Sequence, residues 1–179
     1  PPGLVVWLPA QPHQPDAQIR DRWQDLARQH QLVVLVPEPA KEDRWEPAEL
    51  LVVRKLMDEA IRRFDIDPER VVVAGTKTGG AVAYRLGSMN HELIKGICVA
   101  GAPIPRRTAM RGNDPIERTS YLLLSDPNTE EGVVMRANAD ALEALRLPVT
   151  VQEQSLVDDM LPEEGRAAVT RWCDALDRL

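Results

Sequence analysis

The stretch VVVAGTKTGG, residues 71–80, decides how this chain folds. Its run of small and β-branched apolar residues predicts a buried strand, and the glycines that follow predict a tight turn into a helix. A junction of this kind presents one side chain at its tip, and here that residue is Lys77. The flanking glycines suit such a turn, because its central residue takes strained backbone geometry while strand and helix approach closely.

Strand-like and helical segments alternate on both sides of this turn. The apolar runs are continuous, as in strands that are buried on both faces of a parallel sheet. We therefore predict an α/β fold, a three-layer sandwich whose mainly parallel six-stranded sheet carries helices on both faces. The expected strands are 4–9, 32–37, 70–75, 94–100, 120–126 and 149–154, and the expected helices are 16–30, 47–64, 79–88, 130–146 and 162–179.

The length of 179 residues indicates a single domain, residues 1–179. The sequence enters a predicted strand almost at once and does not begin with Met, so we expect it to be a fragment of a longer multidomain protein. Its cellular compartment is therefore left open.

Composition and charge exclude several classes of partner. The net charge is −6, which argues against binding to nucleic acid or to an anionic membrane. The two cysteines, Cys98 and Cys173, are too few for a disulfide scaffold and are expected to be buried as small apolar residues. The turn at 75–80 matches neither the phosphate-binding loop nor the dinucleotide fingerprint, because its lysine precedes the glycine pair and the glycine spacing differs.

Two longer stretches resemble the α/β-hydrolase family, in particular its small esterase, acyl-peptidase and depolymerase-like members. FDIDPERVVVAGTKTGGAVAYRL, residues 64–86, is similar to the run that leads into that family's nucleophile elbow. YLLLSDPNTEEGVVMRANADALEALRLPVTVQEQ, residues 121–154, is similar to the acid-bearing strand, the next helix and the next strand. The resemblance covers nearly the whole chain. It implies a minimal cap, formed by residues 106–118, with the family's leading antiparallel strands lying upstream of Pro1 or absent.

The resemblance also assigns positions to the catalytic residues of the family. The nucleophile position holds Lys77, and the acid position holds Asp126. The histidine position falls in the loop SLVDDMLP, where Asp158 or Asp159 stands instead. His13 follows the first strand, where the family has its oxyanion loop, but the glycine pair of that loop is missing here. The resemblance therefore implies a degenerate triad.

Three interpretations of the turn follow. Acyl transfer needs a hydroxyl or thiol nucleophile and a base, and both positions have lost them. Thr76, Thr78 or Lys77 could act instead, but threonines that flank an elbow usually bond to backbone, and acidic neighbours keep a lysine charged. We favour the third interpretation, in which Lys77 pairs with Asp126 or Asp158 as a structural ion pair.

We therefore expect a catalytically inactive domain that acts as a binding or accessory module. The alternatives are an active hydrolase, of esterase or peptidase type, with an atypical catalytic residue, or the accessory domain of a larger hydrolase or protease. Expected partners are other domains of the same parent chain, or a protein or small-molecule ligand, with no cofactor and no metal. Asp158 and Asp159, with Glu153 nearby, are interpreted as a solvated helix cap. The expected binding residues are His13, Trp45, Thr76, Lys77, Thr78 and Asp126.

Overall fold

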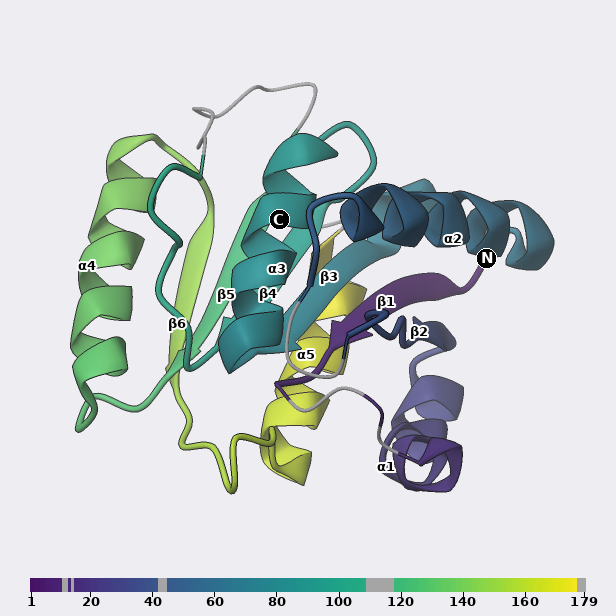
Figure 1. Cartoon of the computed structure of the whole chain (residues 1–179), viewed down its shortest axis with the longest axis horizontal. Helices are drawn as coiled ribbons and strands as arrows, with labels where there is room; N and C mark the ends of the chain where they lie inside the picture. The colour runs from purple at the N-terminus through teal and green to yellow at the C-terminus, as the bar shows by residue number, and fades with distance from the viewer. Residues whose placement is uncertain (11–12, 14, 42–44, 109–117, 177–179) are drawn as a thin grey trace.

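A single six-stranded sheet forms the centre of the molecule (Figure 1). The computed structural model describes residues 1–10, 13, 15–41, 45–108 and 118–176. Every strand pairs with its neighbour in parallel, in the order β2-β1-β3-β4-β5-β6. The strands are β1 (Gly3–Leu8), β2 (Leu32–Leu35), β3 (Val71–Thr76), β4 (Gly96–Ala100), β5 (Ser120–Ser125) and β6 (Val149–Glu153).

Helices cover both faces of this sheet, so the predicted three-layer α/β sandwich is confirmed. The α-helices are α1 (Asp16–Gln29), α2 (Glu49–Phe64), α3 (Lys77–Met89), α4 (Glu130–Ala144) and α5 (Glu163–Ala175), and a short 3-10 helix, η1 (Pro68–Arg70), precedes β3. Helices α2, α3 and α4 pack on one face, whereas α1 and α5 pack on the other. Among the described helices, none has both the length and the apolar character needed to cross a lipid bilayer.

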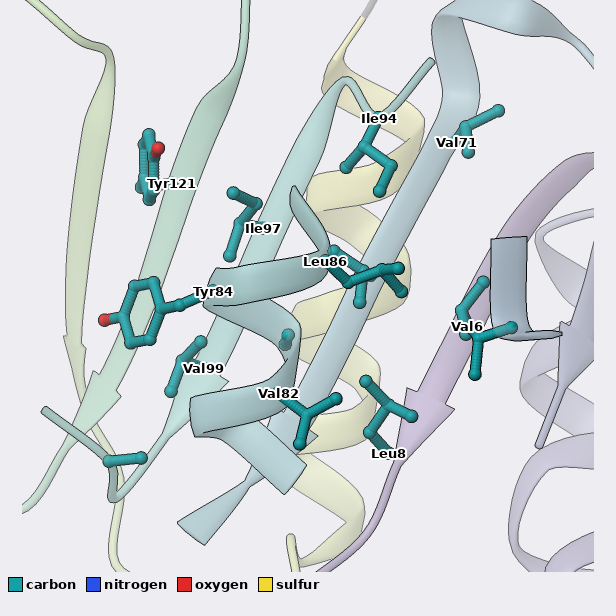
Figure 2. Packing of buried hydrophobic residues seen from close by; sticks show 14 of the residues in the cluster. Val6, Leu8, Val71, Val82, Tyr84, Leu86, Ile94, Ile97, Val99 and Tyr121 are labelled. Atoms are coloured by element: carbon teal, nitrogen blue, oxygen red, sulfur yellow. The ribbon is translucent and has the colours of Figure 1, made fainter. Parts of the chain in front are cut away.

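Two apolar clusters result from the alternation of side chains along the strands. Val6 and Leu8 of β1 join the cluster beneath α2, α3 and α4, which Figure 2 shows, while Val5 and Trp7 face α1 and α5. The first cluster is mostly aliphatic, and the second contains three tryptophans. Full burial of a valine or leucine side chain contributes about 1.5–3 kcal/mol to the stability of the fold. Because both clusters contain such side chains, both faces of the sheet contribute to stability.

The predicted elements agree with the structure to within a few residues. The largest shift that concerns the site is at α3, which begins at Lys77 rather than at residue 79. Cys98 and Cys173 are free and buried, as predicted, and burial raises the pKa of the Cys173 thiol to about 12. The predicted cap segment 106–118 is described only at residues 106–108 and 118, and the end of the closing helix lies outside the described residues.

Candidate functional site

The turn between β3 and α3 has the backbone geometry of an elbow. Lys77 has a φ of 47°, in the left-handed region that few residues other than glycine adopt. A Cβ atom on Gly79 would lie 2.0 Å from the carbonyl oxygen of Leu8, and one on Gly75 would lie 2.6 Å from the Gly79 carbonyl. Glycine is therefore required where α3 crosses the ends of β1 and β3, and the predicted strained turn is confirmed.

Both threonines of the elbow form hydrogen bonds with the backbone of Ala10, in the loop that follows β1. The Thr76 hydroxyl oxygen accepts a hydrogen bond from the Ala10 N–H at 2.9 Å, and the Thr78 hydroxyl donates to the Ala10 carbonyl at 3.3 Å. The interpretation of these threonines as partners of the backbone is confirmed. These two hydrogen bonds hold the first loop against the elbow.

Lys77 lies among carboxylates at the carboxyl end of the sheet. Its Nζ atom is 3.4 Å from Glu131 Oε1 in the first turn of α4 and 4.0 Å from Asp159 Oδ1 in the loop after β6. Gly101 lies beside the lysine side chain with a φ of 61°, and a Cβ there would lie 2.8 Å from Leu156 Cδ1 and 3.4 Å from Lys77 Cε. An ion pair was expected here, but the predicted partners Asp126 and Asp158 were wrong, since the carboxylates of α4 and of Asp159 lie nearer.

Asp126 directly follows β5, and its carboxylate accepts hydrogen bonds from neutral donors. Its Oδ2 atom accepts a hydrogen bond from the Ser155 hydroxyl at 2.7 Å. Its Oδ1 atom accepts from the backbone N–H and the side-chain amide of Asn128, at 2.9 and 3.0 Å. The Ser155 hydroxyl, followed by the Asn128 N–H, lowers the pKa of the Asp126 carboxyl. Both oxygens of the Asp126 carboxylate therefore accept hydrogen bonds from neighbouring residues.

Asp158 and Asp159 form a two-residue turn, so their interpretation as a helix cap was wrong. Both have positive φ angles, 50° and 60°. Val157 and Met160, on either side, exchange backbone hydrogen bonds of 3.0 and 2.9 Å, as in a tight hairpin. The residue that caps α5 is Pro162. In the described part of the chain, no three His, Cys, Asp or Glu side chains gather as metal ligands would.

Two of the expected binding residues lie apart from the elbow. His13 Nδ1 is 3.3 Å from Glu38 Oε2, a contact between the loops that follow β1 and β2. Trp45 packs beside the start of α2 and lines a separate pocket with residues of α3. Of the six residues expected to form one binding site, the structure brings Thr76, Lys77 and Thr78 together at the end of β3. Asp126 follows β5, which is separated from β3 by β4.

Sequence reasoning missed Glu131 and Ser155. Glu131 was expected only as part of a helix, although its place in the first turn after the acid-bearing strand puts it at the carboxyl edge. Its own backbone N–H and then the Lys77 ammonium lower the pKa of the Glu131 carboxyl. Ser155 lies two residues after the end of β6, and its position near a strand end was the available signal.

The crevice beside the elbow is narrow. Its volume is about 10 Å³, and the residues that line it include Ala10, Thr76 and Asp159. A space of this size holds about one water molecule. Lys77 is not among the residues that line this crevice.

Solved structures match this fold over nearly the whole chain. A carboxylesterase from Bacillus cereus is 16% identical with a TM-score of 0.66, and the match covers 98% of this chain and 89% of that one. The Francisella virulence factor BioJ is 13% identical with a TM-score of 0.71, covering 100% and 78%. An S-formylglutathione hydrolase from Agrobacterium tumefaciens is 15% identical with a TM-score of 0.65, covering 97% and 84%.

The chain has an α/β-hydrolase-like fold. No protein-family model matches the sequence, and no curated protein does. Identities of 13% and 16% establish the fold and not the activity, because one fold hosts many functions. The function of the α/β-hydrolase-like domain must therefore be argued from the residues of its own elbow.

Proposed function

We propose that this chain is a catalytically inactive α/β-hydrolase-like domain that serves as a binding or accessory module. The observation that carries the proposal is the tip of the elbow. There Lys77 takes the strained position of a nucleophile, and its ammonium lies 3.4 and 4.0 Å from the carboxylates of Glu131 and Asp159.

An ammonium group in this setting is a poor nucleophile. Lysine attacks a carbonyl only when it loses its proton, which requires desolvation or a nearby positive charge. Lys77 has two carboxylates beside it instead, those of Glu131 and Asp159. The residue at the tip therefore serves electrostatics and packing and does not act in acyl transfer.

Among the described residues, no histidine forms an ion pair with Lys77 at the tip. The chain contains three histidines. His13 contacts Glu38, His30 contacts Asp174, and His91 follows the far end of α3. The 13 residues of α3 span about 20 Å at 1.5 Å each, which places His91 near the opposite edge of the sheet. Without a base, a hydroxyl at the elbow would not be activated.

The preserved elbow supports a role in binding. A left-handed residue other than glycine costs about 1–2 kcal/mol, and such strain persists where the surrounding structure holds it. Glu131 and Asp159 join the lysine from two further elements, so the three charged side chains form one exposed polar surface. We infer that this surface contacts another domain of the same parent protein or a ligand.

Covalent labelling tests the absence of catalysis. The protein is incubated with a fluorophosphonate probe, and hydrolysis of p-nitrophenyl acetate is followed for the wild type and for Lys77→Ser. We expect no labelling of the wild type and no hydrolysis beyond the buffer rate in either protein, because a serine without a base stays unactivated. Labelling of the wild type within residues 75–80 would support the active-hydrolase alternative, and hydrolysis by Lys77→Ser would show that a base is present.

A further inference from the structure

A second pocket lies away from the elbow, between the start of α2, the outer side of α3 and the turn that ends at Thr108. We call it the Trp45 pocket. Its volume is about 360 Å³, which is in the range of small-molecule sites. None of its lining residues belongs to the elbow. The pocket is lined by Trp45, Glu46, Pro47, Leu50, Val82, Arg85, Ser88, Met89, Arg107 and Thr108.

One part of the Trp45 pocket is apolar. Leu50 and Val82 are buried side chains of the large apolar cluster, and Trp45 packs against that cluster. Met89, at the end of α3, is 57% exposed although it is a large apolar residue. An indole ring beside a flexible thioether gives an apolar ligand adaptable contacts.

The other part of the pocket is cationic. Arg85 and Arg107 both line it, and neither pairs with a carboxylate in the described part of the chain. Arginines elsewhere are paired: Arg54 contacts Asp58 and Glu92, for example. The acidic residue of the pocket, Glu46, accepts a hydrogen bond from Lys41 at 2.7 Å, which offsets its charge. Two unpaired guanidinium groups in a protein of net charge −6 favour an anionic ligand.

An unsatisfied hydroxyl adds a third feature. The Thr108 Oγ1 atom is buried and has no hydrogen-bond partner in the part of the chain that the structure describes. A buried hydroxyl without a partner is unfavourable, because it has lost its hydrogen bond to water. A ligand oxygen beside Thr108 and Arg107 would replace that hydrogen bond.

We propose that the Trp45 pocket binds a small amphipathic carboxylate. Its apolar part lies against Trp45, Leu50 and Val82, and its carboxylate accepts hydrogen bonds from the guanidinium groups of Arg85 and Arg107. This site is separate from the elbow, so it stands whether or not the elbow is catalytic.

Three molecules of equal size but different charge test the proposal. The probes are 4-phenylbutyrate, 4-phenylbutanol and 4-phenylbutylamine, each titrated into protein with labelled Met, Leu and Val methyl groups. We expect 4-phenylbutyrate to saturate and to shift the signals of Met89, Leu50 and Val82. The alcohol should bind at least about tenfold more weakly, because it lacks the charge-assisted hydrogen bonds, and the amine should not saturate.

Variants locate the carboxylate. The double substitution Arg85→Ala and Arg107→Ala should lower the affinity for 4-phenylbutyrate about tenfold or more and leave the affinity for the alcohol unchanged. The matched control is Arg62→Ala with Arg63→Ala, which removes the same charge from the exposed far end of α2 and should leave both affinities unchanged. These arginines are exposed, and thermal unfolding of each variant verifies the fold.

Several results would overturn the proposal. They are equal affinity for the carboxylate and the amine, binding of 4-phenylbutyrate that survives the Arg85/Arg107 double substitution, and failure of 4-phenylbutyrate to saturate. A further variant, Ser88→Trp, fills the pocket from its rim and should abolish the methyl shifts. If the shifts persist in the folded Ser88→Trp protein, the ligand binds elsewhere.

Discussion

Two clusters of polar, ionisable side chains lie at opposite ends of the sheet and differ in burial. The elbow cluster, Lys77 with Glu131 and Asp159, has side chains that are 31%, 46% and 56% exposed. The amino-end cluster, His30 with Arg70 and Asp174, has side chains that are 12%, 13% and 32% exposed. Ion pairs in water contribute little to stability, whereas partly buried ones cannot lose one partner without cost.

The amino-end cluster joins three elements that are distant in sequence. Arg70, at the start of β3, donates to the Asp174 carboxylate in α5 and to the His30 carbonyl after α1, the latter at 2.8 Å. The His30 ring bonds to the other oxygen of the same carboxylate. The hydrogen bonds of this cluster therefore link α1 and α5, the two helices of one layer, to the start of β3. At the elbow the backbone is constrained and the charged side chains are replaceable.

The largest effect is expected for Asp174→Ala. The substitution leaves the mostly buried Arg70 guanidinium without its carboxylate and His30 without its partner. We expect a loss of about 3 kcal/mol in the free energy of unfolding, measured by urea denaturation. The control is Asp25→Ala, which removes an 87% exposed carboxylate 4.0 Å from Arg28 and should cost less than about 0.5 kcal/mol. Equal losses in the two variants would show that burial does not distinguish the clusters.

A smaller effect is expected at the tip of the elbow. Lys77→Gly and Lys77→Ala both remove the ion pairs, and they differ only by a Cβ at a φ of 47°. We expect the glycine variant to be more stable by about 1 kcal/mol, measured by urea denaturation.

The same pair of substitutions at Lys55 is the control for the elbow. Lys55 is an exposed residue in the interior of α2, where glycine should instead be less stable than alanine by about 1 kcal/mol. If the alanine variant is the more stable protein at both positions, the backbone at Lys77 is not strained as we propose.

The sheet could be predicted because its signals are local. The apolar run of β3 predicts a buried strand, and the glycines at 75, 79 and 80 predict a tight turn. Each of these signals is contained in a short stretch of sequence. The left-handed residue at position 77 followed from the same short pattern. These features do not depend on contacts with residues that are far away in the sequence.

The charged partners could not be predicted, because they depend on how distant loops converge. Asp126, Glu131 and Asp159 all lie near the carboxyl edge, and the path of each loop decides which oxygen pairs with Lys77. The tight turn at 158–159 also places the two aspartates differently, which no local pattern indicated. Trp45 was expected near Lys77 because both follow strands, but β2 and β3 are separated by β1 in the sheet.

The smallest effect is a change in the pKa of the Asp126 carboxyl. Ser155→Ala removes the hydroxyl that contributes most to lowering the pKa of the Asp126 carboxyl, so that pKa should rise toward its usual value. Asn128 still donates to the other oxygen, so we expect only a partial rise. Carbon-13 detection of the carboxyl signal during a pH titration measures it, and Ser88→Ala is the control because its hydroxyl bonds to a carbonyl.

The sign of the effect on stability follows from the direction of that shift. A carboxyl whose pKa is lower in the folded state stabilises the protein at neutral pH, and this contribution is lost as the pH falls through the lowered pKa. Ser155→Ala should therefore be less stable than the wild type near pH 7, and the difference should vanish in acid below the lowered pKa. An unchanged pKa for Asp126 in Ser155→Ala would mean that the Ser155 hydroxyl does not stabilise the Asp126 carboxylate. The Oδ2 atom of Asp126 would then be open to another hydrogen-bond donor.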